Sequence, residues 1–159
     1  MNSFRPTRRA ILVAGIAVPL SRSITPTRAQ PTFPVIVLYK SSTCTCCQRW
    51  ADHLITAGFE VQVKTPANLA EIRKELGVPT ELASCHTAQV NGYILEGHVP
   101  ADAVVRLLQE RPPASGLAVP GMPAGSPGME ANAPEIYDVV LFGPKGLSVY
   151  DRYRGLSRL

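Results

Sequence analysis

An apolar run that ends in a cysteine-rich loop constrains the fold more than any other feature of the sequence. Residues Phe33 to Tyr39 read FPVIVLY and lead directly into SSTCTCCQRW. Such a run of β-branched and aromatic residues is typical of a strand buried on both faces of a sheet. After it, the apolar residues Cys47, Trp50 and Leu54 recur at helical spacing, and Gly58 follows where a helix commonly ends. A buried strand and an amphipathic helix are therefore expected to meet at a loop of cysteines.

The order of the remaining patterns favours a mixed α/β domain. The predicted elements are, in chain order, a strand at 59–64, a helix at 68–76, two short strands around Asn91-Gly92, a helix at 100–110, and strands at 137–142 and 147–153. A strand–helix–strand unit followed by a hairpin and a closing helix is typical of a thioredoxin-like (glutaredoxin-like) sandwich. The last two strands would add a C-terminal β-hairpin to it.

One segment has a different composition from the rest of the domain. Residues 111–134 hold six prolines and four glycines, and the tripeptide PGM occurs twice, at 120–122 and 127–129. Proline and glycine interrupt helices and strands alike. We therefore predict a loop without regular structure over residues 111–134.

Residues 1–29 have the layout of an export signal. A pair of arginines precedes an apolar stretch of ten residues, Ile11 to Leu20, and a polar region follows up to Ala29. The paired arginines favour the twin-arginine export route. The stretch is too short to cross about 30 Å of hydrocarbon, so no permanent membrane span is expected. We predict cleavage near Ala29, a periplasmic location and a single mature domain over residues 30–159.

The net charge depends on whether this signal is attached. The whole chain has 16 Lys and Arg against 12 Asp and Glu, a formal charge of +4. Five of the basic residues precede residue 30, which leaves 11 basic and 12 acidic side chains in the mature domain. Phosphate binding needs lysines and arginines clustered on the mature surface. The charge pattern therefore argues against nucleic acid as a partner.

The cysteine loop allows three interpretations. Cys44 and Cys47 have the C-x-x-C spacing at the strand-to-helix junction, where backbone N–H groups and the helix dipole favour a thiolate. They could form the active pair of a thiol–disulfide oxidoreductase, they could be halves of two stapling disulfides, or they could bind a soft metal. Cys46 disfavours simple exchange, because a third thiol offers competing, strained disulfides. Crowded thiolates repel one another until a cation neutralises them, which favours a metal site.

The fourth cysteine extends this metal hypothesis. Cys85 directly precedes the predicted hairpin, and in a thioredoxin-like sandwich this strand entry faces the C-x-x-C loop. The predicted metal ligands are therefore Cys44, Cys46, Cys47 and Cys85. Thiolates select Cu(I), zinc and iron–sulfur clusters. Copper fits the C-x-C-C packing best; the alternatives are zinc, with His86 as a further ligand, and a four-cysteine iron–sulfur cluster.

Four further residues are candidates for a secondary role at the metal. His86 adjoins Cys85, His98 lies just beyond the hairpin, and Met122 and Met129 belong to the repeated PGM. Imidazole and thioether groups are both copper ligands. Each residue also has an ordinary structural interpretation, either as a hydrogen-bonded histidine at a strand end or as a methionine that fills an apolar surface.

Three segments together resemble the CopG-like copper-resistance family, a group long described only as a metal-binding domain of unknown function. They read YKSSTCTCCQRWADHL, LGVPTELASCHTAQVNGYILEGHVPADAVVRLL and GLAVPGMPAGSPGME, and the resemblance runs from about Val35 to Tyr153. The combination of C-x-C-C with S-C-H-T-A-x-V is specific to this family.

The resemblance implies a periplasmic, thioredoxin-like protein that acts in copper resistance. It also implies that the residues Cys44, Cys46, Cys47 and Cys85 hold a multinuclear copper–thiolate cluster, and that the protein interconverts Cu(I) and Cu(II) together with other periplasmic copper-handling proteins. The resemblance thus allows either a copper oxidoreductase or a metal-binding protein without enzymatic activity. The related glutaredoxin hairpin carries a cis-proline at the strand entry, where this chain has Cys85-His86. That difference argues against ordinary dithiol exchange.

Overall fold

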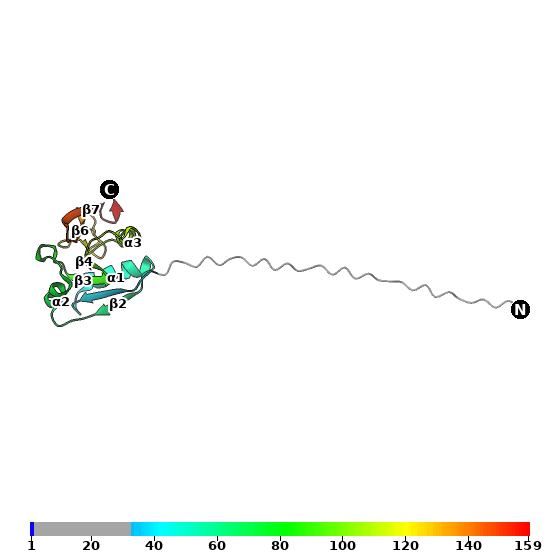
Figure 1. Cartoon of the computed structure of the whole chain (residues 1–159). Helices are drawn as coiled ribbons and strands as arrows, with labels where there is room; N and C mark the ends of the chain where they lie inside the picture. Colours follow the sequence, from blue (N-terminus) through cyan, green and yellow to red (C-terminus); the bar gives the residue numbers. More distant parts are fainter. Residues whose placement is uncertain (2–32) are drawn as a thin grey trace. The chain divides into compact units, whose positions relative to one another are not determined.

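The computed structural model describes Met1 and residues 33–159 (Figure 1). Apart from Met1, the predicted export signal at residues 1–29 lies outside the described residues. Residues 33–159 form a mixed α/β structure with one eight-stranded sheet and three α-helices. Among the described helices, none is long and apolar enough to cross a bilayer.

The elements of this domain are, in chain order, β1 (Ile36–Lys40), α1 (Thr45–Thr56), β2 (Val61–Lys64), α2 (Leu69–Leu76), the 3-10 helix η1 (Thr80–Leu82), β3 (His86–Val90), β4 (Tyr93–Glu96), α3 (Ala101–Glu110), β5 (Gly116–Ala118), β6 (Ile136–Gly143), β7 (Gly146–Arg154) and β8 (Ser157–Arg158). The strand order across the sheet is β2-β1-β3-β4-β5-β6-β7-β8. The pairs β1–β2 and β4–β5 are parallel, and all other neighbours are antiparallel.

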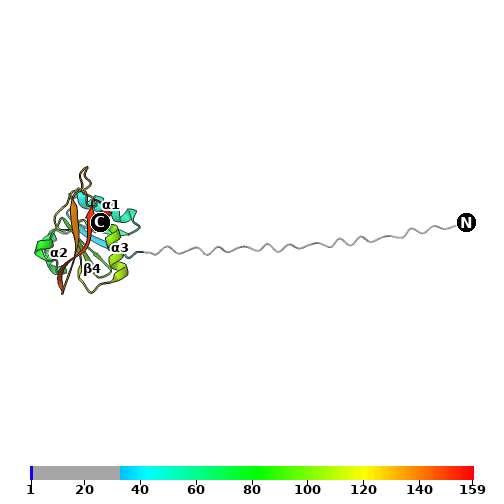
Figure 2. The ribbon, with the colours of Figure 1, turned by 90° about the horizontal axis from the view of Figure 1, so that it is seen from above.

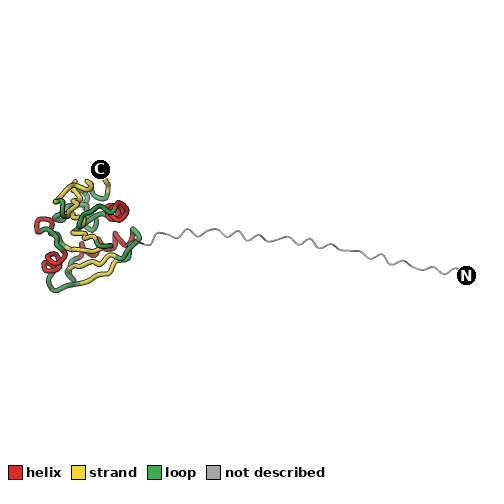
Figure 3. Tube along the Cα trace, in the orientation of Figure 1, coloured by secondary structure: helices red, strands yellow, loops and turns green. Residues whose placement is uncertain are grey.

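The helices cover the sheet from both sides. In Figures 1 and 2, α1 and α3 lie on one side of the strands and α2 lies on the other. Figure 3 shows the same layering, with strands between helices. The main core lies between the sheet and the pair α1 and α3, where Trp50 of α1 donates a hydrogen bond from Nε1 to the carbonyl of Val99 at 2.9 Å.

The predicted strand and helix around the cysteine loop are confirmed, but β1 buries only one face fully and its other face is half-buried, where burial on both faces was expected. β1 starts at Ile36 rather than at Phe33, since Pro34 has no N–H to offer a ladder. α1 begins directly after Cys44, whose Sγ accepts a hydrogen bond from the N–H of Cys47 at 3.4 Å. The helix buries the face predicted from its apolar spacing.

The predicted helix at 68–76 and the predicted hairpin around Asn91-Gly92 are also confirmed. Asn68 caps α2 through its side chain, and Gly77 ends that helix in the left-handed conformation with φ of 71°. Asn91 and Gly92 have φ of 47° and 85°, the left-handed pair that a two-residue hairpin turn requires. This turn returns the chain so that the end of β4 lies beside the start of β3.

The prediction of an irregular loop over 111–134 is wrong in one part. β5 lies within it and pairs with both β4 and β6. The prolines flank this strand without entering it, so its three residues keep the N–H groups that the ladder needs. Gly116 allows the close approach, because a Cβ there would overlap the carbonyl of Ile94. Leu117 and Ala118 are fully buried, which explains why so short a strand is stable.

Candidate metal centre

The four cysteines converge at one end of the sheet. Cys44, Cys46 and Cys47 lie at the junction of β1 and α1, and we call them the α1 side of the centre. β1 and β3 are antiparallel with Lys40 opposite His86, so the end of β1 lies beside the residue that enters β3, which is Cys85. The potential ligand atoms of all four cysteines lie within 4.8 Å of one another. The sheet register therefore explains why residues 38 positions apart meet.

The sulfurs are not equivalent. Cys44 and Cys47 are joined by a disulfide with a Cα–Cα distance of 5.4 Å, whereas Cys46 and Cys85 are free thiols. The Sγ atoms of Cys44 and Cys46 lie 3.4 Å apart. The structure therefore has one disulfide and two free thiols, not the two disulfides that would staple the domain. Reduction of this disulfide would make all four sulfurs available as ligands within 4.8 Å of one another.

Two histidines also lie beside Cys85. The Sγ of Cys85 is 3.2 Å from Nδ1 of His86 and 3.0 Å from Nε2 of His98. The potential ligand atoms of these three residues also lie within 4.8 Å of one another, and both imidazoles are fully buried. We call this second group, Cys85 with His86 and His98, the β3 side of the centre. Cys85 belongs to both clusters of potential ligands.

Contacts with neighbouring groups hold the two imidazoles. Nδ1 of His98 donates a hydrogen bond to the carbonyl of Pro127 at 2.7 Å, which leaves the lone pair of Nε2 facing Cys85. The ring of His86 stacks at a tilt on Trp50, with centroids 4.3 Å apart, and meets the edge of His98 at 5.0 Å. Nε2 of His86 is buried and has no hydrogen-bond partner among the described residues.

Burial keeps the β3 side uncharged when no cation is present. Burial, together with the nearby Cys46, raises the pKa of Cys85 to about 12. Burial lowers the pKa of His98, and it lowers that of His86 further, where the neighbouring His98 adds to the effect. Cys85 is therefore a thiol at neutral pH, and both imidazoles are neutral. A bound cation would reverse this preference by stabilising the thiolate.

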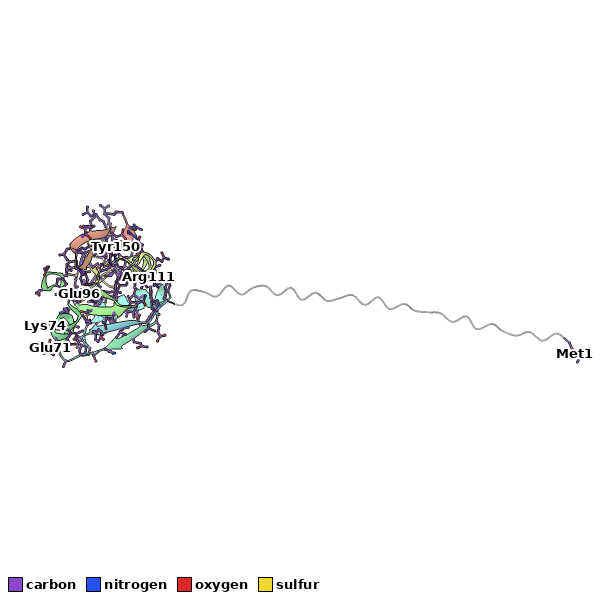
Figure 4. All side chains as sticks on the ribbon, viewed as in Figure 1. Met1, Glu71, Lys74, Glu96, Arg111 and Tyr150 are labelled. Atoms are coloured by element: carbon purple, nitrogen blue, oxygen red, sulfur yellow. A yellow bond between two sulfur atoms is a disulfide. The ribbon has the colours of Figure 1, made fainter. Side chains whose placement is uncertain are left out.

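A buried ion pair fixes the backbone next to Cys85. Glu96, labelled in Figure 4, lies at the end of β4 and is fully buried. It pairs with Arg73 of α2 at 2.9 Å. Oε1 of Glu96 also accepts the N–H of Ser84 at 2.6 Å, and Oε2 accepts the hydroxyl of Thr87 at 2.6 Å. Arg73 donates to the carbonyl of Ser84. Both backbone groups of Ser84 are thus held, and so is the position of the next residue, Cys85.

A second link joins the two sides of the centre. The 126–129 segment, Ser126 to Met129, lies against the first turn of α1: a Cβ on Gly128 would come within 2.6 Å of the Cys46 carbonyl. Arg49 donates from Nε and Nη2 to the carbonyl of Gly128 at 3.0 and 2.7 Å. Pro127 in the same segment accepts from His98. The second PGM repeat therefore contacts both sides of the centre through its backbone.

The predicted secondary residues have different surroundings. The histidines His86 and His98 lie at the cysteines, as described above. Met129 is half-buried in the 126–129 segment, and Met122 is 53% exposed in the loop after β5. The sequence interpretation did not include Arg73 and Glu96. The signal that could have revealed this pair was Glu96, a charged residue at the end of the otherwise apolar strand YILE.

The arrangement of His98 also had a signal in the sequence. Counting outward from the Asn91-Gly92 turn pairs Val90 with Tyr93 and Thr87 with Glu96. Two further steps bring Cys85 opposite His98. The hairpin register therefore predicts this contact once the turn is recognised.

Comparisons with known proteins point in one direction. The family described as "Protein of unknown function, DUF411" matches residues 82–129. Two solved structures of a copper resistance protein copG, forms 1 and 2, are each 40% identical to this chain with a TM-score of 0.72. The match to form 1 covers 77% of this chain and 99% of the other, and the match to form 2 covers 76% and 98%. A search of curated proteins gave no match.

Proposed function

The chain belongs to the CopG-like copper-resistance family, and from this premise we propose that it is a periplasmic copper-binding protein whose reduced cysteines hold Cu(I). The convergence of four sulfurs within 4.8 Å is the observation that carries the proposal. Thiolates prefer soft ions such as Cu(I), which accepts the low coordination numbers and bridging sulfurs that a C-x-C-C sequence offers. Bridging would allow more than one copper ion per chain.

Loading of the full site requires a change in redox state. The disulfide between Cys44 and Cys47 takes up two electrons from an external dithiol, and two thiols form in its place. The thiols lose their protons when copper binds, because the thiolate is the ligand. Copper affinity therefore depends on both reduction and pH.

The finer parts of the proposal concern location, fold and turnover. We propose a thioredoxin-like core from β1 to α3, to which the C-terminal strands are an addition, and export through the signal at residues 1–29. Conversion between Cu(I) and Cu(II), with copper exchanged with other copper-handling proteins of the same compartment, would follow from ligands that favour different oxidation states. Zinc and an iron–sulfur cluster are the alternatives to copper. Zinc could use the histidines beside Cys85, but the second C-x-x-C pair of a typical zinc site is missing from this chain.

Copper stoichiometry tests this function. The mature protein, reduced by a dithiol and loaded with Cu(I), should carry at least one copper per chain by elemental analysis. Cys85→Ser should lower that ratio, because it removes the sulfur shared by both sides. Ser42→Ala, in the exposed part of the same loop, is the matched control and should load normally. Less than one copper per wild-type chain would reject the proposal.

Thiol–disulfide exchange is a second candidate function, favoured by one observation. The Cys44–Cys47 disulfide lies at the N-terminus of α1, where free N–H groups stabilise a thiolate. Metal-free protein would then reduce insulin disulfides in the presence of a dithiol, and Cys44→Ser would abolish this activity. A metal-free wild type that shows no such reduction would exclude the exchange function.

A further inference from the structure

Two hydrogen bonds from α1 hold the start of α3. Trp50 and His53 lie three residues apart on α1, so their side chains extend from the same face of that helix. The indole of Trp50 donates to the carbonyl of Val99 at 2.9 Å. Nε2 of His53 accepts the N–H of Ala101 at 3.1 Å. We call these two hydrogen bonds the α1–α3 clasp.

The bond from His53 replaces a cap that the residue before α3 cannot provide. Pro100 precedes the helix, and a proline side chain has no acceptor atom. The N–H groups of the first turn have no partner within a helix. Ala101, the first residue of α3, is only 6% exposed, and a buried N–H without an acceptor costs free energy. The imidazole of His53 is that acceptor.

An imidazole can fill this role in one protonation state only. A neutral ring accepts through one nitrogen and donates through the other, so the proton of His53 is on Nδ1. The imidazolium ion has an N–H on both nitrogens and cannot accept, and it would lie against the positive end of the α3 dipole. His53 is half-buried, so protons from solvent can reach it. Protonation therefore removes the bond to Ala101 and adds a repulsion.

The charged groups that face His53 come from two other parts of the fold. Burial lowers the pKa of His53, and the carboxylates of Asp102 and Glu130 partly offset this effect. Asp102 lies in the first turn of α3 and accepts the hydroxyl of Tyr153 at 2.8 Å. Glu130 follows the 126–129 segment and pairs with Arg49 at 3.4 Å. These two carboxylates give a charged ring alternative partners after its bond to the helix is lost.

We propose that His53 makes the α1–α3 clasp sensitive to pH: protonation of its imidazole releases the N–H of Ala101 and loosens the first turn of α3, while the bond from Trp50 persists. The indole N–H is a donor only and keeps its proton at any pH of interest. One half of the clasp thus responds to acid and the other does not, which confines the opening to the first turn. This inference does not depend on the proposed copper-binding function, because it concerns the metal-free fold.

Nitrogen-15 NMR of the metal-free mature protein tests this inference. The ring nitrogens of His53 report its protonation, and the amide peak of Ala101 reports the hydrogen bond. As the pH falls from 7 to 5, both should titrate with one midpoint, below the usual histidine value of about 6.5. The amide proton of Ala101 should move towards the lower chemical shifts of amides that bind only water.

Two substitutions at the same position provide the controls. His53→Gln keeps an amide oxygen that can accept the N–H of Ala101 but does not titrate, so the Ala101 peak should stay in place throughout. His53→Ala removes the acceptor, so this peak should lie at its acid position already at neutral pH. His86 and His98 are unchanged in both variants, and a shift that they caused would persist there.

Three results would overturn the inference. The first is a His53 ring that titrates while the Ala101 peak does not move, and the second is an Ala101 titration that persists in His53→Gln. The third is a His53 ring that stays neutral down to the pH at which the domain unfolds. Each would leave the proposed copper-binding function as it stands, because the experiment contains no copper.

Discussion

The α1 side and the β3 side of the candidate centre are built by different means. On the α1 side three cysteines lie within four positions of the chain, at the start of one helix. On the β3 side His98 meets the neighbours Cys85 and His86 only because a hairpin folds back on itself, and a buried ion pair holds the adjoining backbone. The first arrangement is local and contains the disulfide, whereas the second joins two strands and has two fully buried, neutral imidazoles.

This difference bears on how the proposed copper ligands would be held in place. The α1 side changes covalently when its disulfide is reduced, because two thiols replace the bond between Cys44 and Cys47. The β3 side has to be in place before the metal arrives, so its supporting hydrogen bonds contribute to folding as well as to binding. Substitutions outside the ligand set should therefore affect the β3 side more strongly than the α1 side.

Removal of the buried carboxylate should have the largest effect. Glu96→Leu leaves Arg73 without its partner and Ser84 and Thr87 without their acceptor, and such losses cost about 3–5 kcal/mol of unfolding free energy. Urea denaturation of the metal-free protein measures the loss. Asp138→Leu is the control, because it removes an exposed ion pair to Arg152, which contributes little. Equal stability of Glu96→Leu and the wild type would show that this pair does not anchor the β3 side.

A methyl group at Gly128 should push the 126–129 segment away from α1 and so loosen the link between the α1 side and the β3 side. Gly128 has φ of 85°, and a Cβ there would lie 2.6 Å from the carbonyl oxygen of Cys46 and 2.8 Å from the nitrogen of Trp50. Gly128→Ala should cost about 2–4 kcal/mol, from the left-handed backbone and from the overlap. Gly121→Ala has a similar φ of 72° but open space around it, so thermal unfolding should show a clearly smaller loss for this control. Equal losses would mean that the segment does not pack tightly on α1.

Lowering the pH should destabilise the fold by less per pH unit than either substitution above. Most of this effect should come from the histidines of the β3 side. Burial lowers the pKa values of His86, His98 and His53. Below about pH 6.5 the unfolded chain binds protons that the folded chain does not, so stability falls as the pH decreases, by up to about 1.4 kcal/mol per pH unit for each histidine. Denaturation of metal-free protein between pH 7 and 5 measures the slope. His53→Gln should reduce it without abolishing it, and a flat profile would contradict neutral, buried imidazoles.

The sequence predicts the α1 side well because its determinants are neighbours. The apolar run before Cys44 and the helical spacing after it are enough to place three cysteines at a strand-to-helix junction. The Asn91-Gly92 turn likewise defines the hairpin and, through its register, the meeting of Cys85 with His98. These features depend on short-range backbone preferences.

Other parts of the molecule depend on contacts that local patterns do not encode. β5 lies among prolines and is a strand only because β4 and β6 flank it on both edges. The pairing of Arg73 with Glu96 joins α2 to β4, and the carbonyl of Pro127 reaches His98 from a loop 29 residues away. Each needs the assembled sheet before its partner is defined.

The position of Trp50 has a practical consequence. It is the only tryptophan in the chain, and its indole lies 4.3 Å from the His86 ring, measured between centroids. Its fluorescence therefore arises at the centre itself and from nowhere else in the protein. Copper binding, a change in oxidation state or protonation of the adjacent imidazole would each alter that emission, so the unlabelled protein carries an optical reporter with which these events can be followed in real time.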